Sequence, residues 1–366
     1  MSRKKSDTIA IVITGLAFGG AERVTSYLAN YFVSQGRNVH LISLTTGEHA
    51  YPLSEKITIT EYDISPSLPV VFRYLSLIRN IRRTLKTIRP RVVLGMMSYS
   101  GSLACIANLG LRTPFIISER NDPYTSKGFS EFEKKILRFV YRTFVTKGVF
   151  QSKGALSYYY AETDPRGIVI PNPLFTESMP LPNTNSIGLE TIVSAGRLNF
   201  QKNFSLLIQA FHKVHSLHPS YRLIIYGEGE QRVELEALVH SLGLEQAVFL
   251  PGIDKDIFLR FLEAGMFVLS SNFEGMPNAL IEAMAMGLPC ISTDYSEGRG
   301  TVITEGKNGL IVPRNDAEAL SNAMLYLIEN PKYAQDLGRE AAKIREALDS
   351  TSVCKQWLSA IESTTV

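Results

Sequence analysis

The sequence predicts an α/β protein with two doubly wound domains, each built on a parallel sheet wrapped by helices. Its 366 residues fit two domains of about 100–200 residues each. Short β-rich runs alternate with helical patterns, which is typical of parallel sheets with helical crossovers. The alternation stops once, in a proline-rich segment, and then restarts. Hydrophobic residues make up 45% and charged residues 20%, which excludes a mainly disordered or low-complexity chain.

The first half of the chain contains the first run of alternating elements. We expect strands at Ile9–Thr14, Val39–Ser43, Ile57–Glu61, Val92–Met96, Phe115–Ser118 and Gly167–Ile170. We expect helices at Ala21–Ser34, Val71–Ile88 and Phe129–Thr146. The runs that begin at Ile9 and Val92 are almost wholly apolar, as expected for strands covered on both faces.

A proline-rich segment, residues 173–189, predicts a linker between a first domain of residues 1–172 and a second of residues 190–349. In the second domain we expect strands at Thr191–Ala195, Leu223–Tyr226, Ala247–Leu250, Met266–Ser270, Cys290–Ser292 and Leu310–Val312. The expected helices are Asn203–Leu217, Gln231–Leu242, Asp256–Ala264, Asn278–Met286, Ala317–Ile328, Pro331–Ala347 and Ser352–Ile361. Sheets of this kind bind ligands beyond the carboxyl ends of their strands, so we expect the site at those ends, in a cleft between the domains.

The charge is unevenly distributed along the chain. The first 180 residues carry 23 Lys and Arg against 13 Asp and Glu, whereas the last 186 carry 15 against 22. A cationic first half indicates an anionic partner for that half. The three cysteines are far apart and lack metal-ligand spacing, which indicates a reducing compartment. The sequence has no signal-peptide pattern and no apolar stretch long enough to span a bilayer, so we expect a cytoplasmic protein.

Two turns, each between a predicted strand and a predicted helix, are candidate anion-binding loops. The first, residues 15–23, reads Gly-Leu-Ala-Phe-Gly-Gly-Ala-Glu-Arg and lacks both the G-x-G-x-x-G fingerprint and the P-loop lysine. In the second, residues 196–203, Arg197 and Lys202 could neutralise a diphosphate. Glycine lets backbone N–H groups approach an anion at the positive end of a helix. A tight turn is the alternative for the first loop, and a solvated basic turn for the second.

Two carboxylates flank the start of the helix expected at residues 278–286. Glu274 projects from the loop after a strand, and Glu282 lies about one turn into the helix, on the side facing the loop. The helix N-terminus offers N–H groups to phosphate oxygens, so the carboxylates could accept hydrogen bonds from hydroxyl groups on either side of a phosphate. An acid favoured by the helix dipole is the alternative, but it explains only one of the two.

Taken together, these strings resemble the signatures of the retaining GT-B glycosyltransferases of family GT4. The string from Glu274 to Glu282 is similar to the family's Glu-x7-Glu signature, residues 196–203 to its phosphate motif, and residues 18–22 to its glycine loop. The resemblance covers nearly the whole chain. It implies two Rossmann-like domains facing a cleft, with a helix at about residues 350–366 that carries Trp357 and crosses back to the first, acceptor-side domain.

The resemblance also implies roles for individual residues. Arg197 and Lys202 would bind the donor diphosphate and stabilise it as the leaving group, and Glu274 would hold hydroxyl groups of the donor sugar. Glu282 would bind the ribose hydroxyl groups. Further donor contacts would come from backbone groups of Gly19, Gly20, Ile253, Asn278, Ala279 and Leu280. Relatives retain the anomeric configuration through front-face attack, so neither a separate strong base nor a metal or other cofactor is expected.

Two short strings depart from that pattern or invite another interpretation. Many relatives carry a His after the strand expected at residues 115–118, where this chain has Glu119 and Arg120. We assign both to the sugar or acceptor side, with pairing to loop charges as the alternative. Asp254 and Asp256 form an Asp-x-Asp string that could bind a metal ion, but its place before a helix favours capping.

The helix expected at residues 71–88 is strongly basic. Seven basic and no acidic residues lie between residues 72 and 91. Apolar residues recur at every third or fourth position, at Phe72, Leu75, Ile78, Ile81, Leu85 and Ile88. We expect an amphipathic helix that contacts anionic lipid headgroups and the acceptor's pyrophosphate through Arg79, Arg82, Arg83 and Lys86. Residues 132–147 are a second candidate, and a domain helix with a solvated basic face is the alternative for both.

The resemblance predicts a membrane-peripheral enzyme on the inner face of the cell membrane. It would move a hexose or N-acetylhexosamine, GalNAc or galactose, from a UDP-sugar to a polyprenyl-diphosphate-linked saccharide and form an α-linkage, for capsule, lipopolysaccharide or glycoprotein glycans. One alternative keeps the donor chemistry but uses a soluble acceptor. Another is a non-catalytic scaffold that binds nucleotide-sugars. Nucleic-acid binding is not expected, because no recognition module accompanies the charge.

Overall fold

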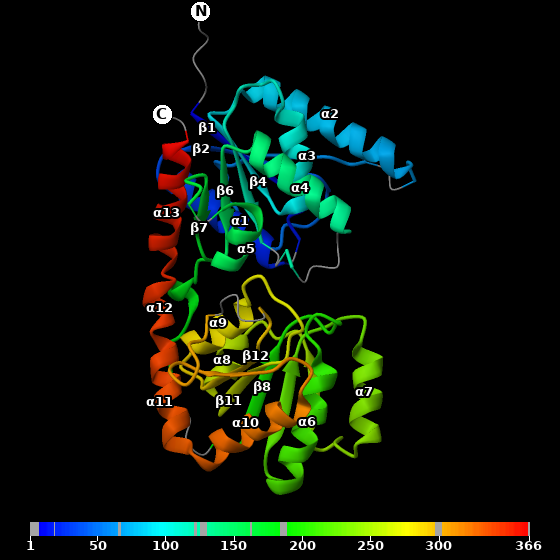
Figure 1. Cartoon of the computed structure of the whole chain (residues 1–366), viewed down its shortest axis with the longest axis vertical. Helices are drawn as coiled ribbons and strands as arrows, with labels where there is room; N and C mark the ends of the chain where they lie inside the picture. Colours follow the sequence, from blue (N-terminus) through cyan, green and yellow to red (C-terminus); the bar gives the residue numbers. More distant parts are fainter. Residues whose placement is uncertain are drawn as a thin grey trace, which may run out of the picture. The chain divides into compact units, whose positions relative to one another are not determined.

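The computed structural model describes residues 7–17, 19–64, 67–120, 123–124, 130–161, 163–183, 189–296 and 302–364. The chain divides into two compact units (Figure 1). One comprises Met1–Pro173 and Thr351–Val366, and the other comprises Leu174–Ser350. Each unit has its own parallel sheet with helices on both faces, which confirms the predicted fold class.

In the described part of the first unit, seven parallel strands follow the order β3-β2-β1-β4-β5-β6-β7. Their bounds are β1 Thr8–Ile13, β2 Asn38–Ser43, β3 Thr58–Glu61, β4 Val92–Met96, β5 Phe115–Glu119, β6 Lys147–Phe150 and β7 Gly167–Val169. The helices are α1 Gly20–Ser34, α2 Val70–Ile88, α3 Ser98–Asn108, α4 Glu131–Phe144 and α5 Lys153–Tyr159. The strand order reverses at β1, because β1 pairs with both β2 and β4.

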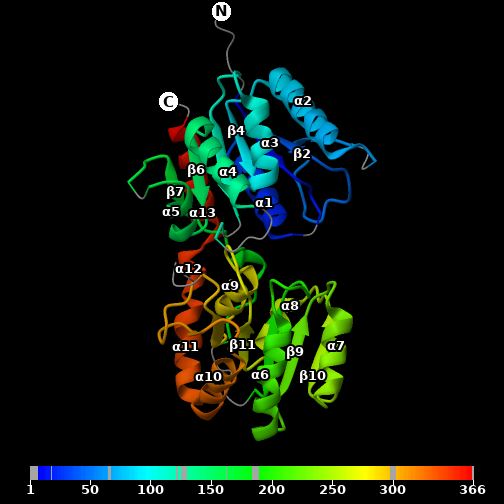
Figure 2. The same cartoon turned by 45° about the vertical axis from the view of Figure 1, so that its right-hand side comes forward.

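Different helices cover the two faces of this sheet. Helices α2, α3, α4 and α5 pack with one set of strand residues in a common core (Figures 1 and 2). Helix α1 packs on the other face together with α13, Ser350–Ser363, the last helix described. Helix α13 contributes residues at helical spacing to that core: Val353, Cys354, Trp357, Ala360 and Ile361. The predicted return of the C-terminal helix to the first domain is therefore confirmed.

The second unit repeats the arrangement with a six-stranded parallel sheet in its described part, in the order β10-β9-β8-β11-β12-β13. The strands are β8 Thr191–Ala195, β9 Arg222–Tyr226, β10 Val248–Gly252, β11 Met266–Leu269, β12 Cys290–Thr293 and β13 Leu310–Val312. The helices are α6 Phe204–Leu217, α7 Arg232–Ser241, α8 Ile257–Leu262, α9 Asn278–Ala285, α10 Ala317–Glu329, α11 Pro331–Ala342 and α12 Ile344–Ala347. Here the order reverses at β8, which pairs with β9 and β11. Loops that follow β8 and β11 therefore meet at the position where doubly wound sheets bind ligands.

Three elements of the first unit were missed by the sequence analysis. Helix α3 carries no amphipathic pattern, because most of its residues are buried. Strand β6 is short and begins with Lys and Gly. Helix α5 spans only seven residues. The predicted start of the preceding helix at Phe129 lies outside the described residues, as do residues 184–188 of the predicted linker.

The predicted apolar face of α2 is partly wrong. Leu77, Ile81 and Leu85 are its buried residues, whereas Phe72 and Leu75 are 61% and 57% exposed. At 100° per residue, Phe72 and Leu75 lie opposite the buried row. Apolar residues at three- and four-residue spacing therefore do not all share one face of this helix.

Candidate active site

Two loops of the second unit meet at the reversal point of its sheet. The phosphate loop, residues 196–203, joins β8 to α6, and the acidic loop, residues 270–277, joins β11 to α9. Strands β8 and β11 are adjacent and parallel, so both loops leave the sheet at its carboxyl edge. This places Arg197 and Lys202 on one loop beside Glu274 on the other.

Lys202 and Glu274 form a direct ion pair. Lys202 Nζ lies 2.6 Å from Glu274 Oε1, and the two side chains are 15% and 7% exposed. Ser271 Oγ also donates to Oε1 at 2.7 Å, and Gln201 Nε2 donates to Oε2 at 3.2 Å. A buried charge is stable only when it is paired and hydrogen-bonded, and this carboxylate meets both conditions.

Gly196 lets the Lys202 side chain lie close to the backbone. A β-carbon at Gly196 would lie 2.7 Å from Lys202 Cε, closer than side chains approach each other. The aliphatic part of Lys202 therefore passes directly over Gly196, and its ammonium group lies beside this glycine, which directly precedes Arg197. Arg197 itself is exposed. The two cations are thus brought to the same end of β8.

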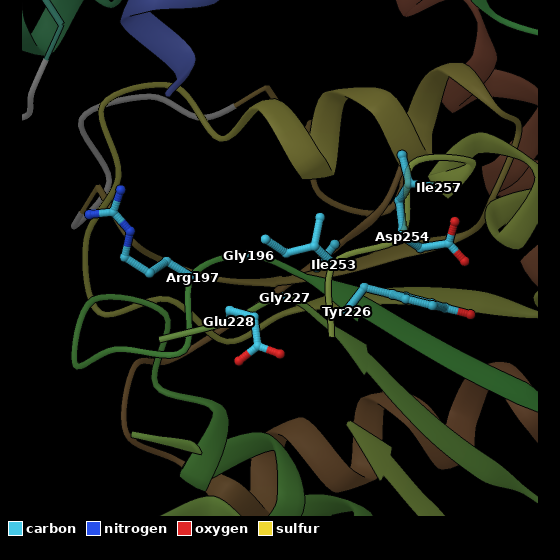
Figure 3. Close-up of a pocket in the computed structure, with 9 residues that line it drawn as sticks. Gly196, Arg197, Tyr226, Gly227, Glu228, Ile253, Asp254 and Ile257 are labelled. Carbon is cyan, nitrogen blue, oxygen red and sulfur yellow. The ribbon is translucent and has the colours of Figure 1, made fainter. Parts of the chain in front are cut away.

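Beside Arg197 is a pocket of about 300 Å³. Its lining residues are Ala195, Gly196, Arg197, Tyr226, Gly227, Glu228, Ile253, Asp254 and Ile257. Figure 3 shows Arg197 at one end, Tyr226 and Asp254 at the other, and Ile253 between them. Ile253, predicted to contact the donor through its backbone, and Arg197, predicted to bind the diphosphate, thus line one pocket.

Each of the two acidic residues that line this pocket, Glu228 and Asp254, forms an ion pair with a neighbouring arginine. Arg232 donates to both oxygens of Glu228, at 2.6 and 2.8 Å, and these hydrogen bonds hold the pKa of Glu228 below its usual range. Arg260 donates to Asp254 at 2.9 Å and lowers the pKa of that carboxyl. Asp254 also accepts the backbone N–H of Asp256, the N-cap of α8, whereas the Asp256 side chain makes no capping hydrogen bond, so side-chain capping by this string is not seen. Among the described residues, no group of three His, Cys, Asp or Glu side chains is placed to hold a metal ion.

Helix α9 supplies the second acid of the predicted signature. Its first residues are Asn278, Ala279 and Leu280, and Pro277 at the N-cap provides no side-chain hydrogen bond. Leu280 is fully buried, and its predicted backbone contact with the donor stays a prediction. Glu282 lies on the next turn and is half-buried. The predicted donor contacts of residues 278–280 and of Glu282 stay predictions.

The predicted glycine loop of the first unit leads directly into helix α1. Gly19 is the N-cap of α1, and Gly20 is its first residue. Glu22 folds back over Gly19, because a β-carbon there would lie 2.0 Å from Glu22 Oε2. The carboxylate at the helix N-terminus is favoured by the dipole. The predicted phosphate contacts of Gly19 and Gly20 stay a prediction, and Phe18 lies outside the described residues.

Glu119 and Arg120 face the interior of the first unit. Glu119 is 1% exposed and accepts hydrogen bonds from Ser98 Oγ at 2.5 Å and Tyr141 OH at 3.2 Å. Arg120 is 7% exposed and donates to Asn172. Burial lowers the pKa of Arg120 to about 10, although Glu119 opposes this shift. Both side chains have hydrogen-bond partners inside the unit, and their predicted contact with a sugar or acceptor stays a prediction.

The basic residues predicted to contact lipid divide into two groups. Arg79, Arg83 and Lys86 are exposed on α2. Arg82 is half-buried and donates to the carbonyls of Ala107 and Leu109, at 2.8 and 2.6 Å. It therefore caps the C-terminus of α3, and its predicted contact with lipid stays a prediction. None of the helices in the described part of the chain has the length and hydropathy needed to cross a membrane.

Several residues around the site were not singled out by the sequence analysis. Gln201 and Ser271 bind the carboxylate of Glu274, while Tyr226 and Glu228 line the pocket. Burial raises the pKa of Tyr226. Each lies within two residues of a strand end or a predicted site residue, which is the signal that could have found it.

Comparisons with known proteins identify the family. The profile described as "Glycosyl transferases group 1" matches residues 183–344, and "Glycosyltransferase Family 4" matches residues 18–155. The chain belongs to the family 4 glycosyltransferases. This glycosyltransferase is 28% identical, over 96% of its length and 98% of the relative, to a Campylobacter jejuni protein. That protein is named GalNAc-alpha-(1->4)-GalNAc-alpha-(1->3)-diNAcBac-PP-undecaprenol alpha-1,4-N-acetyl-D-galactosaminyltransferase.

Two further similarities concern a second relative and a solved structure. The glycosyltransferase is 25% identical to the amylovoran biosynthesis glycosyltransferase AmsD of Erwinia amylovora, over 95% of this chain and 98% of the relative. The crystal structure of Anabaena HepE in complex with UDP and glucose matches with a TM-score of 0.82 at 16% identity, over 98% of this chain and 100% of HepE. The structural match shows the GT-B fold, which confirms the predicted family fold.

Proposed function

We propose that this glycosyltransferase transfers GalNAc or galactose from a UDP-sugar to a polyprenyl-diphosphate-linked saccharide, with retention of configuration and an α-linkage. The observation that carries the donor part is the Lys202–Glu274 ion pair at the reversal point of the second sheet, beside a pocket that contains Arg197. The names of similar proteins support the remainder: one C. jejuni relative is a GalNAc transferase acting on an undecaprenol-linked glycan, and HepE binds UDP.

The proposed chemistry depends on charge stabilisation at the phosphate loop. As the acceptor hydroxyl bonds to the anomeric carbon, the bond between the sugar and the phosphate breaks, and the leaving diphosphate carries the negative charge and takes the hydroxyl proton. Arg197 lines the pocket and Lys202 lies on the same loop, paired with Glu274, so both cations are placed to stabilise that charge. Glu274 releases Lys202 to the phosphate and accepts hydrogen bonds from hydroxyl groups of the sugar. Glu282 holds the ribose, and backbone groups at Ile253 and at residues 278–280 complete the donor site.

A thermal-shift comparison of nucleotides tests the donor. We expect UDP and UDP-GalNAc to raise the melting temperature, because a ligand at about 100 times its Kd stabilises the bound state by about 2.7 kcal/mol. The replacement Arg197→Gln should reduce the shift. The matched control Arg222→Gln, at the opposite edge of the same sheet, should preserve it. Stabilisation by GDP-sugars and not by UDP-sugars would contradict the proposed donor.

The exposed row of α2 supports the acceptor part of the proposal. Phe72, Leu75, Arg79, Arg83 and Lys86 are all exposed, and their spacing places them on one face, opposite the buried residues. The apolar side chains lie at the N-terminal end of this row and the basic ones at the C-terminal end. An apolar end beside a cationic end suits a helix that lies in the interface of an anionic bilayer. We place the enzyme on the inner membrane face, where the basic row also meets the acceptor's pyrophosphate.

Vesicle flotation tests the membrane part. Reversing three charges, with Arg79→Glu, Arg83→Glu and Lys86→Glu, should abolish flotation with phosphatidylglycerol vesicles. Each basic residue near such a surface contributes about 1 kcal/mol, so the partition coefficient should fall by at least about 10²-fold. UDP affinity should not change, whereas turnover on the lipid-linked acceptor should fall.

The control for this experiment reverses three exposed lysines of the second unit, with Lys213→Glu, Lys307→Glu and Lys332→Glu. This variant has the same net charge and should float like the wild type. If both triple variants float and turn over normally, the membrane proposal fails and the soluble-acceptor alternative is favoured.

A further inference from the structure

The phosphate loop and the acidic loop are joined by a dense set of hydrogen bonds centred on Asn272. The backbone N–H of Asn272 donates to Gln201 O at 2.8 Å, and its side-chain Nδ2 donates to Phe200 O at 2.7 Å. Its Oδ1 accepts from Asn203 Nδ2 at 3.2 Å. Its carbonyl accepts from Arg314 Nη1 at 3.0 Å. All the polar groups of Asn272 are therefore engaged, and three loops converge on this one residue.

Hydrogen bonds from the acidic loop fix the backbone of Lys202 and of the two residues before it. Phe200 and Gln201 precede Lys202 in the chain, and both of their carbonyls are held by Asn272. The carbonyl of Lys202 itself accepts Ser270 Oγ at 2.8 Å. Consecutive carbonyls of the phosphate loop are thus bound by the acidic loop. The backbone at Lys202 cannot shift along the acidic loop without breaking several of these hydrogen bonds at once.

Asn272 also lies close to Glu274 along the acidic loop. Gln201, whose carbonyl Asn272 holds, uses its side chain to bind Phe273 O and Glu274 Oε2, both at 3.2 Å. The spacing between the Lys202 ammonium group and the Glu274 carboxylate is therefore set through Asn272. In group transfer, a displacement of about 1 Å at the reacting groups can lower the rate by about 10²-fold.

We propose that Asn272 is a positioning residue that holds Lys202 and Glu274 in register for sugar transfer. The inference rests on the proposed roles of those two residues. Asparagine suits the position because its amide donates to one carbonyl of the phosphate loop and accepts from Asn203 at the same time. Alanine keeps the two backbone bonds and removes both side-chain bonds, so it isolates the contribution of the amide.

The test is a double-mutant cycle on donor turnover. The replacement Asn272→Ala should lower kcat by at least about tenfold, with the Kd for UDP changed by less than about threefold, because the flexible Lys202 still reaches the phosphate from a displaced loop. The double variant Asn272→Ala/Glu274→Gln should lose little beyond Glu274→Gln alone, because Asn272 acts through that carboxylate. The control Asn322→Ala removes an exposed bond from Lys213 Nζ, 3.0 Å long, and should leave kcat unchanged.

These variants distinguish failure of the proposed function from failure of the positioning role of Asn272. If Glu274→Gln and Lys202→Ala both keep full activity, the proposed function fails. If those variants lose activity while Asn272→Ala matches the wild type, only the positioning role fails. If the losses of the two single variants add fully in the double variant, the positioning role would also be overturned, because a general loss of structure adds independently to the loss from Glu274→Gln.

A second variant covers the case in which Asn272→Ala does not fold. Asn203→Gly removes one bond to Asn272, and glycine tolerates the left-handed backbone at this position, where φ is 48°. It should lower kcat several-fold with the same small effect on UDP binding. An unchanged kcat in this variant would count against the proposal.

Discussion

Replacing Lys202 with alanine should lower kcat/KM for the donor by about 10²–10³-fold, the usual loss when one fixed donor to a developing anion is removed. The ammonium group lies 2.6 Å from Glu274, and the Lys202 side chain is only 15% exposed, so water cannot simply take its place. The lost charge would otherwise neutralise the diphosphate as the bond to the sugar breaks. Initial rates over a range of UDP-sugar concentrations measure the effect.

The matched control for Lys202 is Lys213→Ala. Lys213 is an exposed lysine of the same unit, on α6, with its ammonium group 3.9 Å from Glu318. Exposed ion pairs contribute little, about 0–1 kcal/mol, so this variant should keep both its activity and its stability. A Lys202→Ala enzyme with more than half the wild-type kcat/KM would remove Lys202 from the donor site.

The Lys202→Ala variant should also have a lower free energy of unfolding than the wild type. Its Glu274 has lost the cation that pairs with it, while the Glu274 side chain remains only 7% exposed. Ser271 and Gln201 still donate to the carboxylate, which limits the loss. Circular dichroism during urea unfolding separates this effect from catalysis. If activity falls only in proportion to the folded fraction, the charge of Lys202 has no direct role in transfer.

The position of the donor loops could be predicted from the sequence, whereas their internal contacts could not. Both loops follow apolar runs that form buried strands, and the carboxyl edge of a parallel sheet is a general binding place. The order of strands brings β8 and β11 together, so Lys202 and Glu274 become neighbours. Their direct pairing depends on how the Lys202 side chain passes over Gly196, which no periodicity or spacing encodes.

Burial of polar side chains was the least predictable feature of the first unit. Arg82 was interpreted as a surface residue from the basic pattern of its helix, and Glu119 and Arg120 as site residues from their place after a strand, where many relatives carry a His. In the structure Arg82 donates to carbonyls at the end of α3, and Arg120 donates to Asn172. Such partners come from segments distant in sequence. Local pattern therefore does not predict that these side chains have hydrogen-bond partners inside the unit.

Replacing Trp357 with alanine should destabilise the first unit by about 3–5 kcal/mol, the usual loss for a buried aromatic side chain. Trp357 is fully buried in the core that α13 shares with α1 and the sheet. Its ring also lies against Arg120, with Arg120 Cζ 5.3 Å from the ring centroid. Removing the ring leaves a cavity and takes away a face that contacts a buried cation. We expect the loss in calorimetry or in urea unfolding followed by circular dichroism.

The neighbouring exposed residue Gln356 provides the control, since Gln356→Ala should change stability by less than about 0.5 kcal/mol. Trp357→Phe should lie between the two variants, because it keeps an aromatic face toward Arg120 while it loses volume. Trp357 is the only tryptophan of the chain, so its fluorescence in the wild type reports whether α13 is docked. A loss below about 1 kcal/mol for Trp357→Ala would mean that the core closes without the ring, and that α13 is held by its aliphatic contacts alone.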